Sequence, residues 1–146
     1  MNIKSLSAAL IMLAAFTIMA ACGKRDRQAG DFTAAELAMI HESDSIMRVL
    51  TIDAPSDLAV LRSLSYDLSD SALLSDDFKR LAELMVATVT HPSQDGVGIA
   101  GPQVGLNRRV IAEQRFDKEG EPFEVYPNVR IVWASDSLAA GPEGCL

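Results

Sequence analysis

The spacing of apolar side chains predicts one long amphipathic helix in the middle of the chain. Ser75 supplies an N-cap, Asp76 and Asp77 place negative charge on the first turn, and the pair His91-Pro92 ends the pattern. The apolar residues of this stretch lie three or four positions apart, on one helical face: Phe78, Leu81, Ala82, Met85 and Val89. We therefore expect this face to be core packing.

The pattern before this helix is less regular. Thr33-Ala-Ala-Glu36 has the form of a capping box, which predicts a helix through Leu37 and Ile40 toward Met47. The apolar run 46–50 fits the end of that helix or an edge strand equally well, and Pro55 breaks it. Residues 56–70 have mixed periodicity, so we expect irregular chain with short turns there.

After Gln103 the pattern changes to short strands. Residues 109–114 and 123–126 predict a hairpin across a turn at 117–120, and residues 129–134 predict a further strand. Residues 139–146 are rich in turn formers. A helix followed by antiparallel strands predicts the α+β fold class.

The first 21 residues are typical of an export signal. Lys4 is followed by an uncharged apolar stretch, and Met19-Ala20-Ala21-Cys22-Gly23 resembles the lipobox of bacterial lipoproteins. We expect lipidation of Cys22, a tether over residues 22–32, and a domain over residues 33–146. This predicts a membrane-anchored lipoprotein of a bacterial cell envelope, facing the periplasm or the exterior. The alternative is an ordinary cleaved signal with an incidental cysteine.

Composition narrows the class of protein. The chain has 146 residues, 49% of them hydrophobic and 23% charged, which excludes a disordered chain and fits one domain. Its net charge of −7 argues against a nucleic-acid partner that needs a basic patch. Two cysteines are too few for a disulfide scaffold.

Two short segments carry the candidate chemistry. Residues 96–105 read Gly-Val-Gly-Ile-Ala-Gly-Pro-Gln-Val-Gly, and four glycines in ten residues indicate unusual dihedrals or a close approach. The formal Gly-x-Gly-x-x-Gly match is weak evidence for dinucleotide binding, because a helix precedes it in place of a strand. The second segment is Glu143-Gly-Cys-Leu146.

Taken together, the two segments resemble peptide deformylases. The family's first motif, Gly-x-Gly-x-Ala-x-x-Gln, is matched by residues 96–103, and its second, Glu-Gly-Cys-Leu-Ser, by residues 143–146. Segments 47–50 and 57–62 also resemble the family, so the resemblance covers about residues 46–146. It implies a metal-dependent hydrolase that removes the formyl group from N-formylmethionyl peptides.

The resemblance also implies roles for individual residues. Cys145 would be a ligand of a divalent metal. Ferrous iron is the expected ion, and zinc, nickel and cobalt are the alternatives. The Gln103 amide and the Leu146 N–H would polarise the formyl oxygen. Gly98 would keep the wall beside the metal low, and Ile99 would present its backbone to substrate. Structural alternatives stay open: Gln103 as a loop-capping amide, Cys145 as a plain thiol, and Ile99 without a decided role.

One departure from the family stands out. The family's other ligands come from a His-Glu-x-x-His helix, and neither His41 nor His91 begins such a motif. The sequence therefore predicts a deformylase domain cut short after Leu146 and inactive as written. The alternative function is a non-catalytic, lipid-anchored binding module that retains part of the fold.

Overall fold

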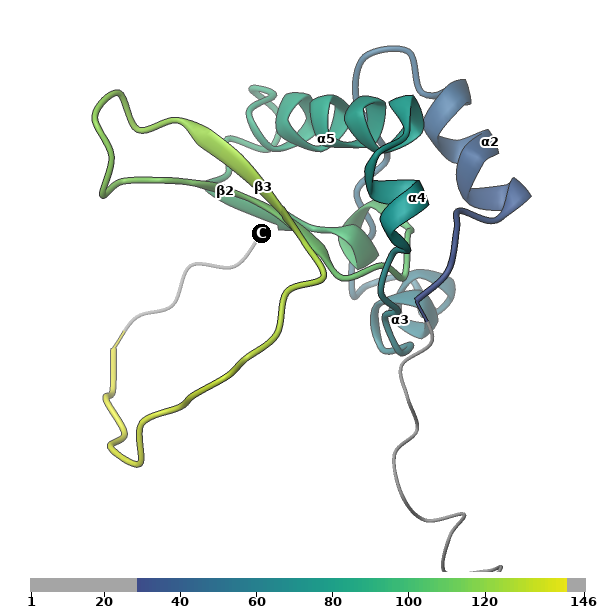
Figure 1. Ribbon diagram of the computed structural model, residues 1–146. Helices are drawn as coiled ribbons and strands as arrows, with labels where there is room; N and C mark the ends of the chain where they lie inside the picture. Colours follow the sequence, from purple (N-terminus) through teal and green to yellow (C-terminus); the bar gives the residue numbers. More distant parts are fainter. Residues whose placement is uncertain (1–28, 142–146) are drawn as a thin grey trace, which may run out of the picture.

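The computed structural model describes residues 29–141, and its first helix begins at the expected capping box. Helix α2 spans Ala34–Glu42 (Figure 1). The Thr33 hydroxyl accepts from the Glu36 N–H at 3.3 Å, and the Glu36 carboxylate accepts from the Thr33 N–H at 2.7 Å. These reciprocal bonds satisfy two of the backbone donors that a helix start leaves unpaired. The helix ends at Glu42, before Met47.

Helix α5 (Asp76–Val89) is the long amphipathic helix that the sequence predicts. The Ser75 hydroxyl caps it by accepting from the Phe78 N–H at 3.2 Å. Leu81, Met85 and Val89 have no exposed surface, so the predicted core face is confirmed. Helix α2 lies against α5 and adds Ile40, also fully buried, to the same core (Figure 1).

An antiparallel sheet of three strands forms the other half of the domain. Strands β1 (Gly98–Ala100), β2 (Val110–Gln114) and β3 (Phe123–Pro127) are arranged in sequence order, with β2 in the centre. The β2–β3 hairpin projects from the domain in Figure 1. Helix α5 contacts all three strands. The α+β class and the hairpin are thus confirmed.

Two predictions fail between the helices. Residues 56–70, expected to be irregular, include most of helix α3 (Pro55–Leu61), and helix α4 (Asp70–Leu73) starts at the last of them. Pro55 begins α3 because its missing N–H costs nothing at the first helical position. Ser69 caps α4 by accepting from the Ala72 N–H at 3.1 Å. The run 46–50 belongs neither to α2 nor to a strand.

A third prediction fails after β3. Residues 129–134, expected to be a strand, have no strand partner within the described part of the chain. Ile131, Val132 and Trp133 are between 78% and 93% exposed. Figure 1 shows the chain leaving the domain here as an open loop. A strand-forming pattern needs a neighbour to become a strand, and none of the described residues supplies one.

Candidate functional site

The glycine-rich segment folds as strand β1 followed by the 3-10 turn η1 (Gly101–Val104). A Cβ at Gly101 would lie 2.7 Å from the Arg108 carbonyl oxygen and 2.9 Å from that of Leu106, so no larger residue fits there. Gly105 ends the turn with φ of +87°, a left-handed conformation that favours glycine. These two glycines therefore serve close packing and turn geometry, and they hold the turn that carries Gln103.

Gln103 is fixed at both its backbone and its side chain. Its Oε1 accepts from the Ala100 N–H at 2.9 Å, and its backbone carbonyl accepts from the Leu50 N–H at 2.8 Å. The amide group is planar, so this bond orients the Nε2 group away from Ala100. The side chain is half-buried. Gln103 is thus a loop-capping amide, as the structural alternative held, and its Nε2 group points away from Ala100.

Sequence reasoning included Ala100 as a match to the motif but missed the role of its backbone. Its backbone N–H, not its side chain, orients the Gln103 amide. A backbone contact leaves no trace in residue type, so only the small side chain at this position was visible in the sequence.

Strand β1 presents one edge that no described strand covers. The Gln114 N–H donates to the Val97 carbonyl at 2.8 Å, and bonded pairs alternate along an antiparallel ladder. Ile99 therefore points its backbone groups at β2, and Gly98 points its own at the open edge. The Ile99 side chain is buried in the core. Gly98 therefore leaves its N–H and its carbonyl at the edge of β1 that faces away from β2.

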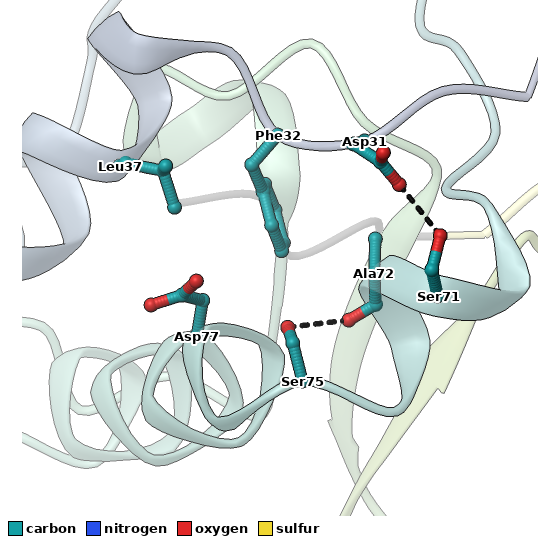
Figure 2. A pocket seen from close by; sticks show the side chains of 7 residues that line it. All are labelled: Asp31, Phe32, Leu37, Ser71, Ala72, Ser75 and Asp77. Carbon is teal, nitrogen blue, oxygen red and sulfur yellow. Dashed lines mark hydrogen bonds between the residues drawn. The ribbon is translucent and has the colours of Figure 1, made fainter.

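A small cavity of about 190 Å³ lies elsewhere, where the chain before α2 crosses α4 and the start of α5 (Figure 2). The Asp31 carboxylate in its wall accepts from the Ser69 and Ser71 hydroxyls, which hold the pKa of Asp31 below its ordinary value. The Asp77 carboxylate is also in the wall, and its Oδ1 lies 2.8 Å from His41 Nε2, within hydrogen-bond distance. Its polar groups are paired internally, and none of the predicted site residues lines it.

The remaining predicted site residues lie outside the described residues. Cys22, Cys145 and Leu146 belong to this group, so the structure places neither the expected lipid attachment point nor the expected thiolate ligand. Between residues 29 and 141 there is no cluster of three or more His, Cys, Asp or Glu side chains that could hold a metal ion. His41 pairs with Asp77, and His91 hydrogen-bonds Ser93 at 2.8 Å.

Comparisons with known proteins agree on one family. The sequence model for polypeptide deformylase matches residues 46–146. A peptide deformylase of Caulobacter sp. (strain K31) is 36% identical over 103 residues. That alignment covers 70% of this chain and 57% of the relative, so the chain spans little more than half of the relative's length.

Solved structures give the same result. A class I type b peptide deformylase from Acinetobacter baumannii superposes with a TM-score of 0.58 at 30% identity, covering 70% of this chain and 64% of that one. A second structure, of a peptide deformylase of the same type and organism with Met-Ala-Ser bound, has a TM-score of 0.57 at 29% identity. It covers 70% of this chain and 66% of that one.

Proposed function

Because this chain belongs to the polypeptide deformylase family, we propose that it forms the formyl-binding part of a hydrolase acting on N-formylmethionyl peptides. The observation that carries this proposal is the fixed Gln103 amide. Its Oε1 is occupied by the Ala100 N–H at 2.9 Å, so Nε2 is the group left to donate to a ligand oxygen. A preoriented donor stabilises the charge that develops on a carbonyl oxygen under attack.

The open edge of β1 supports a peptide as the ligand. Gly98 leaves an N–H and a carbonyl at this edge, five residues before the Gln103 amide. An extended peptide pairs with such an edge through main-chain hydrogen bonds. The Acinetobacter structure with Met-Ala-Ser bound shows that a protein of this family holds a short peptide. We propose that Gly98 binds the backbone of the substrate, and that the Leu146 N–H adds a second donor to the formyl oxygen.

The metal of the family does not fit the described residues alone, since they contain no suitable ligand cluster. In our proposal Cys145 is one ligand of a divalent metal, with ferrous iron as the expected ion, and a His-Glu-x-x-His segment supplies the other protein ligands. Cys145 lies outside the described residues, and the printed sequence does not contain that segment.

The decisive experiment compares formate release by the 146-residue chain with release by a chimaera. The chimaera extends the chain with the C-terminal part of the Caulobacter relative, and both proteins are assayed anaerobically with ferrous ion and a formyl-methionyl peptide. We expect turnover and tight stoichiometric metal only in the chimaera, because one thiolate does not hold a catalytic ion. Metal-dependent turnover by the 146-residue chain would contradict our assignment of the site.

Substitutions in the chimaera separate the roles. Cys145→Ala should remove the metal, whereas Gln103→Ala should retain the metal and slow turnover by roughly 10²–10³. Gln94→Ala, in the loop after α5, is the matched control and should leave the rate unchanged. A Gln103→Ala chimaera with full activity would refute the role of this amide.

A second candidate function is a non-catalytic module that binds formylated peptides, and the Gln103 amide and the open edge of β1 support it without a metal. Titration of the 146-residue chain with a fluorescent formyl-methionyl peptide tests this function. Saturable binding that Gln103→Ala weakens supports it, and no binding at high concentration excludes it.

We also propose that Cys22 carries a lipid that holds the protein on a bacterial membrane. The supporting observation is the sequence around Cys22, which resembles a lipobox. Separately, none of the helices within residues 29–141 is long and apolar enough to cross a membrane. Labelled palmitate should enter the wild-type protein in cells and fail to enter Cys22→Ala. Equal labelling of the two proteins would refute the anchor.

A further inference from the structure

The N-terminal strap, residues 29–45, precedes the residues that match the family and yet is bound to the loop after Gln103. The link is Arg108, whose side chain is only 8% exposed. Its Nε and Nη2 donate to the two Glu36 carboxylate oxygens at 2.7 and 2.8 Å. Further donors reach the carbonyls of Asp31 at 2.6 Å, Gly30 at 3.3 Å and Asp67 at 3.2 Å. Four of these five hydrogen bonds thus end on the strap.

The same loop packs directly on the turn that carries Gln103. The Arg108 carbonyl lies so near Gly101 that a Cβ there would be 2.7 Å away, and the Leu106 N–H donates to the Gly101 carbonyl at 2.9 Å. On the other side, Met39 of α2 faces Gly105, where a Cβ would be 3.5 Å from its sulfur. The strap therefore contacts the Gln103 turn through Met39 and the following loop through Glu36.

We propose that the Glu36–Arg108 pair is a positioning device for Gln103, and that the strap holds the amide in its donating orientation. The importance of this amide rests on the proposed function, but the positioning itself does not. A bidentate arginine–carboxylate pair restricts orientation as well as distance, so it suits this task better than a single hydrogen bond. Arg108 and Glu36 act through the 105–108 loop and do not touch the ligand.

The test measures hydrogen exchange of the Ala100 amide, which is protected while it donates to Gln103 Oε1. The Met85 amide, in the buried part of α5, reports opening of the whole domain. In the full 146-residue chain, Glu36→Gln should speed Ala100 exchange about tenfold relative to Met85, because losing a bond to a charged partner releases the loop locally. Equal acceleration of both amides, or none at Ala100, would overturn the proposal.

Two further variants make the result specific. Asp117→Asn removes one partner of another bidentate pair, with Arg115 in the β2–β3 hairpin, and should leave the Ala100-to-Met85 ratio unchanged. Met39→Ala removes the contact under Gly105 without touching the ion pair and should raise the ratio, which preserves the test if Glu36→Gln folds poorly. If Glu36→Gln folds too poorly to be measured, an unchanged ratio in Met39→Ala overturns the claim that the strap holds the Gln103 amide. Exchange is read without substrate, so failure here is distinct from failure of formate release.

Discussion

The two ends of the described chain behave in opposite ways. The N-terminal strap lies outside the family match but contributes Ile40 to the core and Glu36 to a buried ion pair. The outer segment, residues 131–141, lies inside the match but is exposed along its whole length. The strap has as many polar or charged residues as apolar ones, eight of each among its seventeen, whereas the outer segment includes the large apolar residues Ile131, Val132 and Trp133.

This contrast teaches that available partners, more than hydrophobicity, decide whether a segment packs. The guanidinium of Arg108 has five donors in a fixed fork, and four of its hydrogen bonds end on oxygen atoms of the strap. The chain just before the outer segment is attached to the domain. Asn128 exchanges hydrogen bonds of 2.8 and 2.9 Å with the Leu68 backbone, and the Val129 N–H donates to the Arg109 carbonyl at 3.4 Å. Beyond Arg130, which pairs with Asp67, the segment has no described neighbour that buries it.

We expect the largest effect on stability from removing the strap, and little effect from removing the outer segment. A chain of residues 46–146, compared with 29–146, loses Ile40 and four of the hydrogen-bond acceptors of Arg108. We expect it to lose about 5 kcal/mol or more, near the full stability of a small domain, and so to lose its cooperative thermal transition. A chain ending at Arg130 should keep that transition. Circular dichroism melting tests both, and equal losses would refute the comparison.

Arg108→Ala should have the next largest effect. It leaves the Glu36 carboxylate half-buried without its guanidinium, and breaking a buried pair costs roughly 3–5 kcal/mol. We expect a loss of about 3 kcal/mol in urea unfolding, because part of the pair stays within reach of water. Arg115→Ala in the exposed hairpin network is the matched control, and its loss should be much smaller. Similar midpoints for both variants would contradict the buried role of Arg108.

Low pH should weaken the attachment of the strap, because it protonates the Glu36 carboxylate that pairs with Arg108. Burial alone would raise the pKa of Glu36, but hydrogen bonds from Arg108 and Thr33 outweigh it and hold the pKa below its ordinary value of 4.5. A lowered folded-state pKa contributes stability above the unfolded-state value, and this stability is lost as the pH falls through the folded-state value. The free energy of unfolding should therefore favour wild type over Glu36→Gln most strongly near neutral pH.

This difference should shrink once the pH drops below about 4.5. Urea titrations from about pH 7 to about pH 3 measure it. Glu119→Gln, in the exposed hairpin turn, controls for general charge effects. A gap between wild type and Glu36→Gln that does not depend on pH would show that Glu36 acts by shape and not by charge.

The smallest effect on stability should come from the outer segment. Trp133→Ser should change the free energy of unfolding by less than about 0.5 kcal/mol, because the side chain is 78% exposed. The fully buried Leu81→Ala should cost roughly 2–5 kcal/mol in the same assay. Trp133→Ser should also reduce light scattering at high concentration, since exposed apolar chain promotes association. A large destabilisation would show that Trp133 is packed.

The elements that could be predicted are those whose signals are local. The Thr33–Glu36 capping box and the Ser75 cap with its apolar face lie within one stretch of chain, and both helices start as expected. Helix α3 was missed because the mixed periodicity of residues 56–70 hid a helix of seven residues. The strand over 129–134 was wrong because strand formation depends on a neighbour, which a local pattern does not specify.

The candidate site likewise contains residues that a local motif predicts and residues whose roles depend on contacts distant in sequence. Gln103 could be predicted because it belongs to a family motif. Its orientation could not, because it depends on the backbone N–H of Ala100, and residue type does not show where a backbone N–H points. Arg108 was missed entirely, since its partners Glu36 and Asp67 are 72 and 41 residues away in sequence. The roles of Cys145 and Leu146 stay predictions, because both lie outside the described residues.

The bridge between Gly30 and Leu68 and the long span from Glu36 to Arg108 also order the events of folding. The β2–β3 hairpin joins residues close in sequence, and such contacts close in microseconds. The strap cannot form its hydrogen bonds until Arg108 has been synthesised. Closing so long a loop costs conformational entropy, which the bonds to the guanidinium offset only once they form. Although α2 is synthesised before Arg108, we therefore expect it to be among the last described elements to settle and among the first to detach when the protein is pulled from its N-terminus.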